Sequence, residues 1–181
     1  MSAKKKTVIA IFSAAALLIA LISFLYGSYR RPYREEVRGS GVNEALVFAV
    51  MKAESGFRED VKSRAGAVGM MQLLPSTAQF ICEREGLEFY AEKLTDGAYN
   101  VRLGCLYLHY LLEKFDCKET AVAAYNAGEG VVAEWLAIQE YSDDGVRLKK
   151  IPYPETQSYV KKIVRFEKGY TLLYGKGLGK I

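Results

Sequence analysis

The longest apolar stretch of the chain runs from Thr7 to Tyr26 and contains no charged side chain. A helix of that length spans about 30 Å, the hydrocarbon thickness of a bilayer. The pattern therefore predicts one membrane-spanning helix near the N-terminus, preceded by the lysines at residues 4–6. A cleaved secretory signal has a shorter apolar centre and a cleavage site between small residues. Residues 24–29 offer no good cleavage site, so a retained anchor is favoured and a cleaved signal is the alternative.

The rest of the chain separates into a polar segment and a long region of helical periodicity. Residues 27–41 are polar and charged, with Pro32 and several Gly and Ser, which predicts a short stalk. The folded domain is expected over residues 42–174, and the glycine-rich residues 175–181 are expected to form a flexible tail. With a basic start and an anchor over residues 1–26, the sequence predicts one domain attached to a membrane helix.

Apolar side chains inside the domain repeat every three or four residues, as they do along a helix with one buried face. Helix boundaries are indicated by residues that favour the first turn or the cap, such as Pro75, Asp96 and Pro154. The helices expected are residues 42–54, 75–85, 96–115, 118–126, 131–138 and a last helix from residue 154. No segment alternates with period two over a useful length, so the predicted fold class is all-α.

Composition and charge argue against some classes of function. The net charge is +4, and the basic residues are scattered, so no nucleic-acid partner is expected. Cys82, Cys105 and Cys117 lack metal-ligand spacing, and the single His109 has no companion ligand, so neither a metal nor another cofactor is expected. Cys105 falls on an apolar helical stripe and is expected to be a buried free thiol. A Cys105–Cys117 disulfide is the alternative.

Glu54 breaks the apolar pattern of the first domain helix. It continues the row of Leu46 and Val50 on a buried face, and it lies near the C-terminal end of the helix, where the helix dipole disfavours a carboxylate. Both effects raise the pKa of a carboxyl group because both penalise its ionised form. A glutamic acid that is protonated near neutral pH can protonate a leaving glycosidic oxygen. The alternative is a glutamate at a frayed helix end that turns toward solvent.

Four sequence blocks resemble the lytic transglycosylases of the soluble-transglycosylase (SLT) type, which are relatives of goose-type lysozyme. In chain order they are ESGF at 54–57, SRAGAVGMMQLLPSTA at 63–78, NVRLG at 100–104 followed by AYNAG at 124–128, and IPYPET at 151–156 with Tyr159 and Val160. The resemblance extends over roughly residues 43–170 and implies a lysozyme-like fold. One departure is Leu74, where many members have methionine. Both side chains are apolar, so little effect is expected.

The activity that this resemblance implies is cleavage of the β-1,4 bond between N-acetylmuramic acid and N-acetylglucosamine in peptidoglycan, without consumption of water. Glu54 would protonate the glycosidic oxygen and would then, as a base, accept the proton of the muramoyl C6 hydroxyl, which closes a 1,6-anhydro ring. The substrate's own N-acetyl group would stabilise the cationic intermediate, so no carboxylate nucleophile is expected. The implied partner is the glycan strand, cut by a single-pass cell-membrane protein whose catalytic domain is extracytoplasmic.

The resemblance also implies a set of residues that contact the substrate or support its site. They are Ser55, Ser63, Gln72, Tyr125, Asn126 and Glu155. Ser55 would orient the acid, and Ser63 and Gln72 would hydrogen-bond sugar or N-acetyl groups. Gln72 lies in a strongly apolar stretch, where a polar amide needs partners.

The three later residues of this set have simpler alternative roles. Tyr125 would direct its hydroxyl toward Glu54 or the N-acetyl group, and Asn126 would hold that turn. Tyr125 is alternatively a core aromatic residue with a satisfied hydroxyl. Glu155 would bind on the muramoyl side of the substrate. Because proline and acidic residues both favour the first turn of a helix, Pro154 and Glu155 are alternatively helix-start residues only.

A hydrolytic muramidase of the same fold is the main alternative function. It would need a positioned water and a second carboxylate, for which Glu59 and Asp60 are the nearby candidates. Both lie in a polar stretch that is typical of a solvated loop. A non-catalytic glycan-binding module is a further alternative. Glu54 argues against it, because a binding module has no need of an acid.

Overall fold

The computed structural model describes residues 3–175, although few side chains before residue 11 are described. The chain divides into two compact units, Met1–Arg31 and Pro32–Ile181. Of the predicted flexible tail, residues 175–181, all but Gly175 lie outside the described residues, so the prediction for the tail is not tested.

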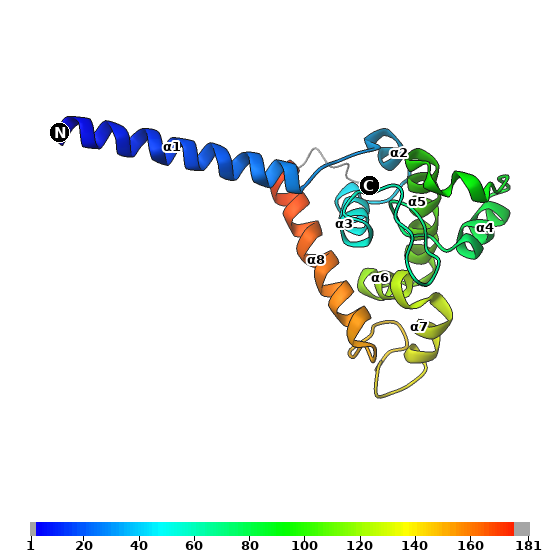
Figure 1. Ribbon diagram of the computed structural model, residues 1–181. Coiled ribbons are helices and arrows are strands. Elements are labelled where there is room, and N and C mark those ends of the chain that lie inside the picture. The colour runs from blue at the N-terminus through cyan, green and yellow to red at the C-terminus, as the bar shows by residue number, and fades with distance from the viewer. Residues whose placement is uncertain (1–2, 176–181) are drawn as a thin grey trace. The chain divides into compact units, whose positions relative to one another are not determined.

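The first unit is a single helix, α1 (Ala3–Ser28), drawn in blue in Figure 1. Its residues Ile11–Ser28 have a mean hydropathy of 2.1, and none of them is buried. By length and composition α1 is therefore able to cross a membrane. The prediction of a helix over residues 7–26 is confirmed, and its insertion into a membrane stays a prediction.

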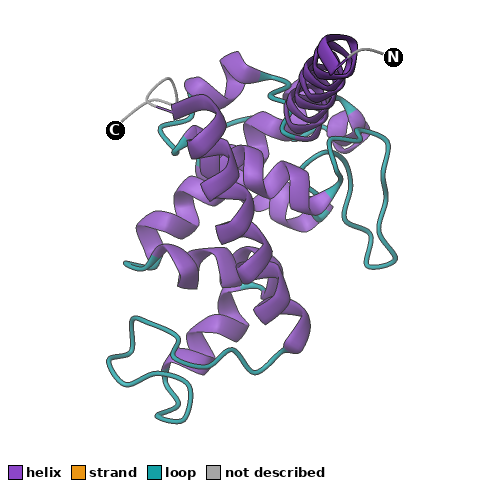
Figure 2. Cartoon of the chain, turned by 90° about the vertical axis from the view of Figure 1, so that its left-hand side faces the viewer, coloured by secondary structure: helices purple, strands orange, loops and turns teal. Residues whose placement is uncertain are grey.

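The second unit consists of helices joined by loops (Figure 2). Its elements are α2 (Arg34–Arg38), α3 (Glu44–Glu54), α4 (Pro75–Arg84), the 3₁₀ helix η1 (Ala91–Thr95), α5 (Gly97–Lys114), α6 (Lys118–Ala127), α7 (Glu129–Leu136) and α8 (Pro154–Tyr174). Residues 3–175 contain no β-strand, only isolated bridges of Val68 with Lys62 and with Leu73. The all-α prediction is confirmed, and the six predicted helices correspond to α3 through α8.

Side-chain caps fix the starts of two helices that carry the site. The Asp96 carboxylate accepts a hydrogen bond from the Tyr99 amide at 2.8 Å and so caps α5, as predicted. The Asn43 side chain accepts hydrogen bonds from the amides of Ala45 and Leu46, at 3.0 and 3.3 Å, at the start of α3. Each cap satisfies amide groups that have no partner within the helix.

α3 forms the centre of the second unit. All its residues from Glu44 to Met51 are buried, as predicted from its continuous apolar run. It packs chiefly against α8 (Figure 1). In this contact the ring centre of Phe48 lies 5.5 Å from that of Tyr170. Burial of each large apolar side chain contributes roughly 1.5–3 kcal/mol. The last turn of α3 is less enclosed, and this turn carries Glu54.

The folded unit begins earlier than the sequence indicated, since residues 27–41 were expected to form a stalk. α2 lies within that segment, packs against α5 and α3, and buries Val37 completely. Tyr33 lies so close to the start of α5 that a Cβ atom on Gly97 would be 2.3 Å from its hydroxyl oxygen. The structural boundary is therefore at Pro32. One buried residue in a helix this short gives no periodicity that a sequence pattern could reveal.

Candidate active site

Glu54 is the last residue of α3, and its side chain is half-buried. Burial raises the pKa of its carboxyl group from an ordinary 4.5 to about 7, and the negative charge of Glu155 adds to the rise. The Tyr159 hydroxyl and the Lys162 ammonium group act in the opposite direction. Near neutral pH the protonated and ionised forms of Glu54 therefore coexist. The predicted increase in the pKa of this carboxyl group is confirmed, with burial as the largest cause.

After burial, the hydroxyl of Tyr159 on α8 has the largest effect on the pKa of Glu54. Its hydroxyl is buried and, in the part of the chain that the structure describes, has no partner with standard hydrogen-bond geometry. Burial, followed by the charge of Glu54, raises the pKa of this phenol well above its ordinary value, so it stays neutral. A neutral, unsatisfied hydroxyl beside Glu54 can rotate to donate to the carboxylate when that group ionises.

Ser55 fastens the end of α3 to the loop that joins α3 to α4. Its buried hydroxyl donates to the Met70 carbonyl at 2.8 Å and accepts from the Arg58 amide at 3.2 Å. Nε of Arg58 donates to the Ser55 carbonyl at 2.8 Å, which satisfies a free carbonyl group near the helix end. The Ser55 hydroxyl is therefore engaged within the protein, where it holds the turn that carries Glu54.

The α3–α4 loop is fixed by one buried amide, that of Asn100 in α5. Its Oδ1 accepts from the Met71 amide at 2.8 Å, and its Nδ2 donates to the carbonyls of Val68 and Leu94 at 3.0 and 2.9 Å. Gly69 lies against this side chain with φ +81°, and a Cβ atom there would be 2.4 Å from Nδ2. Glycine is required for both reasons, since other residues rarely adopt this φ and their side chains would collide.

Gln72 and Ser63 lie in the same loop and support its turns. The backbone of Gln72 has a left-handed φ of 49°, and its side-chain nitrogen donates to the carbonyls of Val61 and Gly69 at 3.0 and 2.8 Å. Among the described residues nothing donates to its side-chain oxygen, which leaves that oxygen available to a ligand. Oγ of Ser63 accepts from the Ala67 amide at 3.0 Å.

Tyr125 reaches this loop from α6. Its hydroxyl donates to the Met71 carbonyl at 2.8 Å, and its ring centre lies 5.3 Å from that of Tyr107 in α5. Burial, followed by the charge of Glu54, raises the pKa of Tyr125 well above its ordinary value. Tyr125 is therefore on the same side of the molecule as Glu54. Its hydroxyl is bonded to the loop and not to the carboxyl group.

Asn126 connects the end of α6 to the start of α8. Its Oδ1 accepts a hydrogen bond from the Thr156 hydroxyl at 2.8 Å, and Thr156 is buried. The preceding residue, Glu155, is exposed in the first turn of α8, where its charge acts on Glu54. Asn126 thus fixes the helix start that carries Glu155.

The predicted residues therefore gather around Glu54 in two ways. The charge of Glu155 raises the pKa of Glu54, and the charge of Glu54 in turn raises the pKa of Tyr125. Ser55 holds the end of α3, which carries Glu54, and Asn126 holds the start of α8, which carries Glu155. Gln72 belongs, with Ser63, to the loop that the Ser55 hydroxyl and the Tyr125 hydroxyl both contact.

Tyr159, Lys162 and Asn100 belong to this arrangement but were not predicted as site residues. Tyr159 was named as part of the last motif block, and its ring is buried in the core. The spacing of Glu155, Tyr159 and Lys162, at four and three residues, places all three on one helix face and could have revealed them. Asn100 is a polar residue at a buried helix position, and such a residue needs hydrogen-bond partners.

The second carboxylates considered for a hydrolase are both exposed. Glu59 accepts a hydrogen bond from the Tyr33 hydroxyl at 2.7 Å, and Asp60 lies beside it in the loop after α3. Neither residue is among the charges that shift the pKa of Glu54, whereas Glu155 is.

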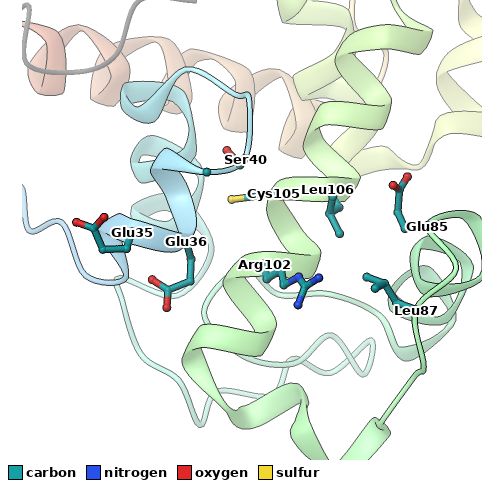
Figure 3. A pocket seen from close by; sticks show the side chains of 9 residues that line it. Glu35, Glu36, Ser40, Glu85, Leu87, Arg102, Cys105 and Leu106 are labelled. Carbon is teal, nitrogen blue, oxygen red and sulfur yellow. The ribbon is translucent and has the colours of Figure 1, made fainter.

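A cavity of about 420 Å³ lies beside α2 and α5 and is lined by other residues, among them Glu36, Arg102 and Cys105 (Figure 3). No predicted site residue lines it. Burial raises the pKa of the Cys105 thiol to about 12, so this thiol is unreactive. All three cysteines are free, as favoured from the sequence. The described residues contain no cluster of His, Cys, Asp and Glu side chains that could hold a metal ion.

Known proteins with the same sequence pattern identify the family. The family model of the transglycosylase SLT domain matches residues 32–146. The chain belongs to the transglycosylase SLT domain family. The chain is 31% identical over 153 residues to the soluble lytic murein transglycosylase of Salmonella typhimurium, an alignment that covers 82% of this chain and 24% of that protein. It is 29% identical over 160 residues to the membrane-bound lytic murein transglycosylase C of Actinobacillus pleuropneumoniae, covering 76% of this chain and 44% of that protein. The chain thus spans about a quarter of the length of its soluble relative.

Solved structures give the same assignment. The 70-kDa soluble lytic transglycosylase of Escherichia coli matches with a TM-score of 0.73 and 26% identity, over 86% of this SLT chain and 26% of that chain. Slt of Pseudomonas aeruginosa, solved as an inactive mutant with glutamine in place of a glutamate, matches with a TM-score of 0.70 and 29% identity, over 83% of this chain and 25% of that chain. The predicted SLT resemblance and lysozyme-like fold are confirmed.

Proposed function

We propose that this SLT domain cleaves the β-1,4 bond between N-acetylmuramic acid and N-acetylglucosamine in peptidoglycan and leaves a 1,6-anhydro-muramoyl end. The observation that carries the proposal is the carboxyl group of Glu54, whose pKa is raised to about 7 at the open end of a buried helix. Membership in the SLT family supports the choice of substrate.

Glu54 acts first as an acid. Its protonated carboxyl group donates a proton to the glycosidic oxygen, the bond from that oxygen to C1 of the muramoyl residue breaks, and N-acetylglucosamine leaves with a free 4-hydroxyl group. A carboxyl group whose pKa lies close to the working pH is both sufficiently protonated and sufficiently acidic for this step. Burial supplies that pKa.

The same carboxylate then acts as a base. It accepts the proton of the muramoyl C6 hydroxyl as the C6 oxygen bonds to C1, which closes the anhydro ring and restores protonated Glu54. No water is consumed. The hydroxyl of Tyr159, which is buried beside Glu54, is placed to donate to the carboxylate between the two steps. The substrate's N-acetyl group stabilises the positive charge at C1.

The remaining site residues hold the substrate or the groups that touch it. The free side-chain oxygen of Gln72 accepts from a substrate N–H or O–H group, and Ser63 contributes a hydroxyl from the same loop. Glu155 binds on the muramoyl side from the exposed first turn of α8. Ser55 and Asn126 support the site without touching the substrate, because their polar groups bond to the Met70 carbonyl and to Thr156.

The alternative, a hydrolytic muramidase, makes a different prediction for Glu59 and Asp60. A retaining hydrolase needs a second carboxyl group about 5–5.5 Å from its acid, and an inverting one needs it about 6.5–9.5 Å away. Because both residues are exposed and neither acts on Glu54, we expect Glu59→Gln and Asp60→Asn to retain most of the activity on purified sacculi. Mass spectrometry of the products should find anhydro ends. Loss of activity in either variant, with reducing muramic acid as the main product, would favour the hydrolase.

We also propose that α1 anchors the protein in the cell membrane as a single span, with the SLT domain on the extracytoplasmic side. The apolar, unburied window of α1 supports the anchor, and one of the chain's relatives is named as a membrane-bound enzyme. The proposed substrate requires this orientation, since murein lies outside the cytoplasm. The basic residues on the two sides of the apolar run at residues 7–26 are balanced, so they do not decide the orientation.

The full-length protein is therefore expected to fractionate with membranes, to resist extraction by high salt, and to be released by detergent. Salt weakens electrostatic attachment to a membrane surface but not insertion of an apolar helix. Protease added from the extracytoplasmic side should digest the SLT domain. A soluble protein whose N-terminus begins near Ser28 would identify α1 as a cleaved signal, and protection from the protease would contradict the orientation.

A further inference from the structure

One face of α8 carries a row of groups that approach the end of α3. Glu155, Tyr159, Lys162 and Phe166 follow one another at spacings of four, three and four residues, which places them in line along the helix. α8 packs more extensively against α3 than against any other helix (Figure 1). The row therefore presents an acidic, a phenolic, a basic and an aromatic side chain, in this order, to one helix.

Two contacts set the register of this row against α3. The ammonium group of Lys52 lies 5.0 Å from the ring centre of Phe166, and the hydroxyl of Tyr159 interacts with Glu54. Lys162 lies on the row between Phe166 and Tyr159, one helical turn from Tyr159. Its side chain is thus placed beside the last turn of α3, which ends at Glu54.

The ammonium group of Lys162 is free to act on Glu54. Lys162 is exposed, and within residues 3–175 it makes no hydrogen bond, ion pair or cation–π contact. Its positive charge favours the carboxylate form of Glu54, whereas the negative charge of Glu155 favours the protonated form. The neighbouring Lys161 instead donates to Gln157 at 3.4 Å and has no such effect on Glu54.

Among the side chains that the structure describes, the other polar groups around Glu54 do not supply a second free cation. On α3 the ammonium group of Lys52 makes a cation–π contact with the Phe166 ring. After α3 the Arg58 side chain donates to the Ser55 carbonyl. α6 contributes the neutral phenol of Tyr125. α2 meets α3 near the opposite end, where its arginines at residues 34 and 38 lie 3.7 Å from a carboxylate oxygen of Glu44.

We propose that Lys162 is a positioning residue of the active site, whose ammonium group stabilises the Glu54 carboxylate between the two proton transfers. The inference rests on the proposed function, because only an acid that next acts as a base must persist as a carboxylate beside the substrate. Lys162 and Glu155 then act as opposed charges on the two sides of Tyr159. Removal of the positive charge leaves the negative one unbalanced and makes the carboxylate form less favourable.

The test compares Lys162→Met with Lys161→Met in the full-length protein in detergent micelles. Both substitutions remove one exposed positive charge from the same helix and introduce a good helix former. In Lys162→Met, titration of the Glu54 carboxyl carbon by NMR should give a pKa higher by about 0.3–0.7 unit at low salt. Lys161→Met should leave that pKa unchanged. In 1 M salt the difference between the two variants should shrink, because the Debye length is then only about 3 Å and the charge of Lys162 is largely screened.

Activity gives a second readout. The alkaline limb of the kcat/KM profile of Lys162→Met should move upward by the same fraction of a unit, while Lys161→Met follows the unmodified protein. The titration needs no substrate, so it tests the role of Lys162 even if the proposed function is wrong. A shift in the pKa of Glu54 without anhydro products would support the role of Lys162 and contradict the proposed function. An unchanged or lowered pKa of Glu54 in Lys162→Met, or an equal shift in Lys161→Met, would overturn the proposal.

Discussion

Replacement of Glu54 by glutamine is expected to reduce glycan cleavage by roughly 10³–10⁴-fold, at the upper end of what one general acid–base group contributes. The amide keeps the size of the side chain, but it can neither donate the proton to the glycosidic oxygen nor accept the proton of the C6 hydroxyl. Both steps are lost together because one residue performs both. The rate of release of soluble muropeptides from purified sacculi measures the effect.

The same variant should keep its fold and lose a pH dependence of stability. The pKa of Glu54 is about 7 in the folded protein and near 4.5 in an unfolded chain, so the fold binds this proton more tightly. The resulting stabilisation is fully present below about pH 4.5 and is lost as the pH rises from there through about 7. Glutamine never ionises, so above pH 7 Glu54→Gln should be more stable than the unmodified protein by roughly 1–3 kcal/mol.

Glu134→Gln provides the control for this experiment, since Glu134 is an exposed glutamate of α7. It should change neither activity nor the pH dependence of unfolding. Circular dichroism should give the same helical signal for all three proteins. Wild-type activity in Glu54→Gln would remove Glu54 from the mechanism. A stability difference that does not grow between about pH 4.5 and pH 7 would contradict its raised pKa.

Replacement of Asn100 by alanine is expected to lower the free energy of unfolding by about 3–5 kcal/mol, because three buried hydrogen bonds are lost and their partners stay buried. The partners are the Met71 amide and the carbonyls of Val68 and Leu94. Urea unfolding measures the change. Activity should also fall under conditions where the variant is folded, because Asn100 fixes the loop that carries Gln72.

Asn43→Ala is a matched substitution at the cap of α3. It removes two hydrogen bonds at an exposed residue, so water replaces the lost partner, and the expected cost is about 1 kcal/mol. Activity should be retained, since the cap is at the opposite end of α3 from Glu54. An equal loss of stability in the two variants would contradict the structural role of the Asn100 amide.

The sequence was sufficient for the features that depend on local chemistry. The apolar run of α3 predicted a buried helix, Asp96 predicted the start of α5, and the row that ends in Glu54 predicted a carboxyl group with a raised pKa. Each of these features follows from the sequence of one helix. For α3 to α8 the predicted and observed helices differ only in their terminal residues. The motif blocks then identified the family that the comparisons confirm.

The features that were missed depend on contacts between segments far apart in the chain. α2 is held by its packing on α5, with Val37 as its buried residue, and no pattern within residues 27–41 indicates that. Asn100 reaches across to the α3–α4 loop, and Lys162 acts on a residue of another helix. A sequence gives the face on which such a side chain lies, but the partner becomes known only when two helices are packed together.

In the proposed mechanism, Glu54 directs the C6 hydroxyl, and not water, to C1 of the muramoyl residue. Digestion of purified sacculi in H₂¹⁸O, followed by rapid reduction and mass spectrometry of the muropeptides, tests it most directly. A transglycosylase forms anhydro ends that contain no ¹⁸O, because the attacking oxygen comes from the substrate. We predict this result for the unmodified protein, and for Glu54→Gln a yield of these ends that is lower by the same roughly 10³–10⁴-fold. Reducible muramic acid ends that carry one ¹⁸O atom at C1 would contradict the mechanism.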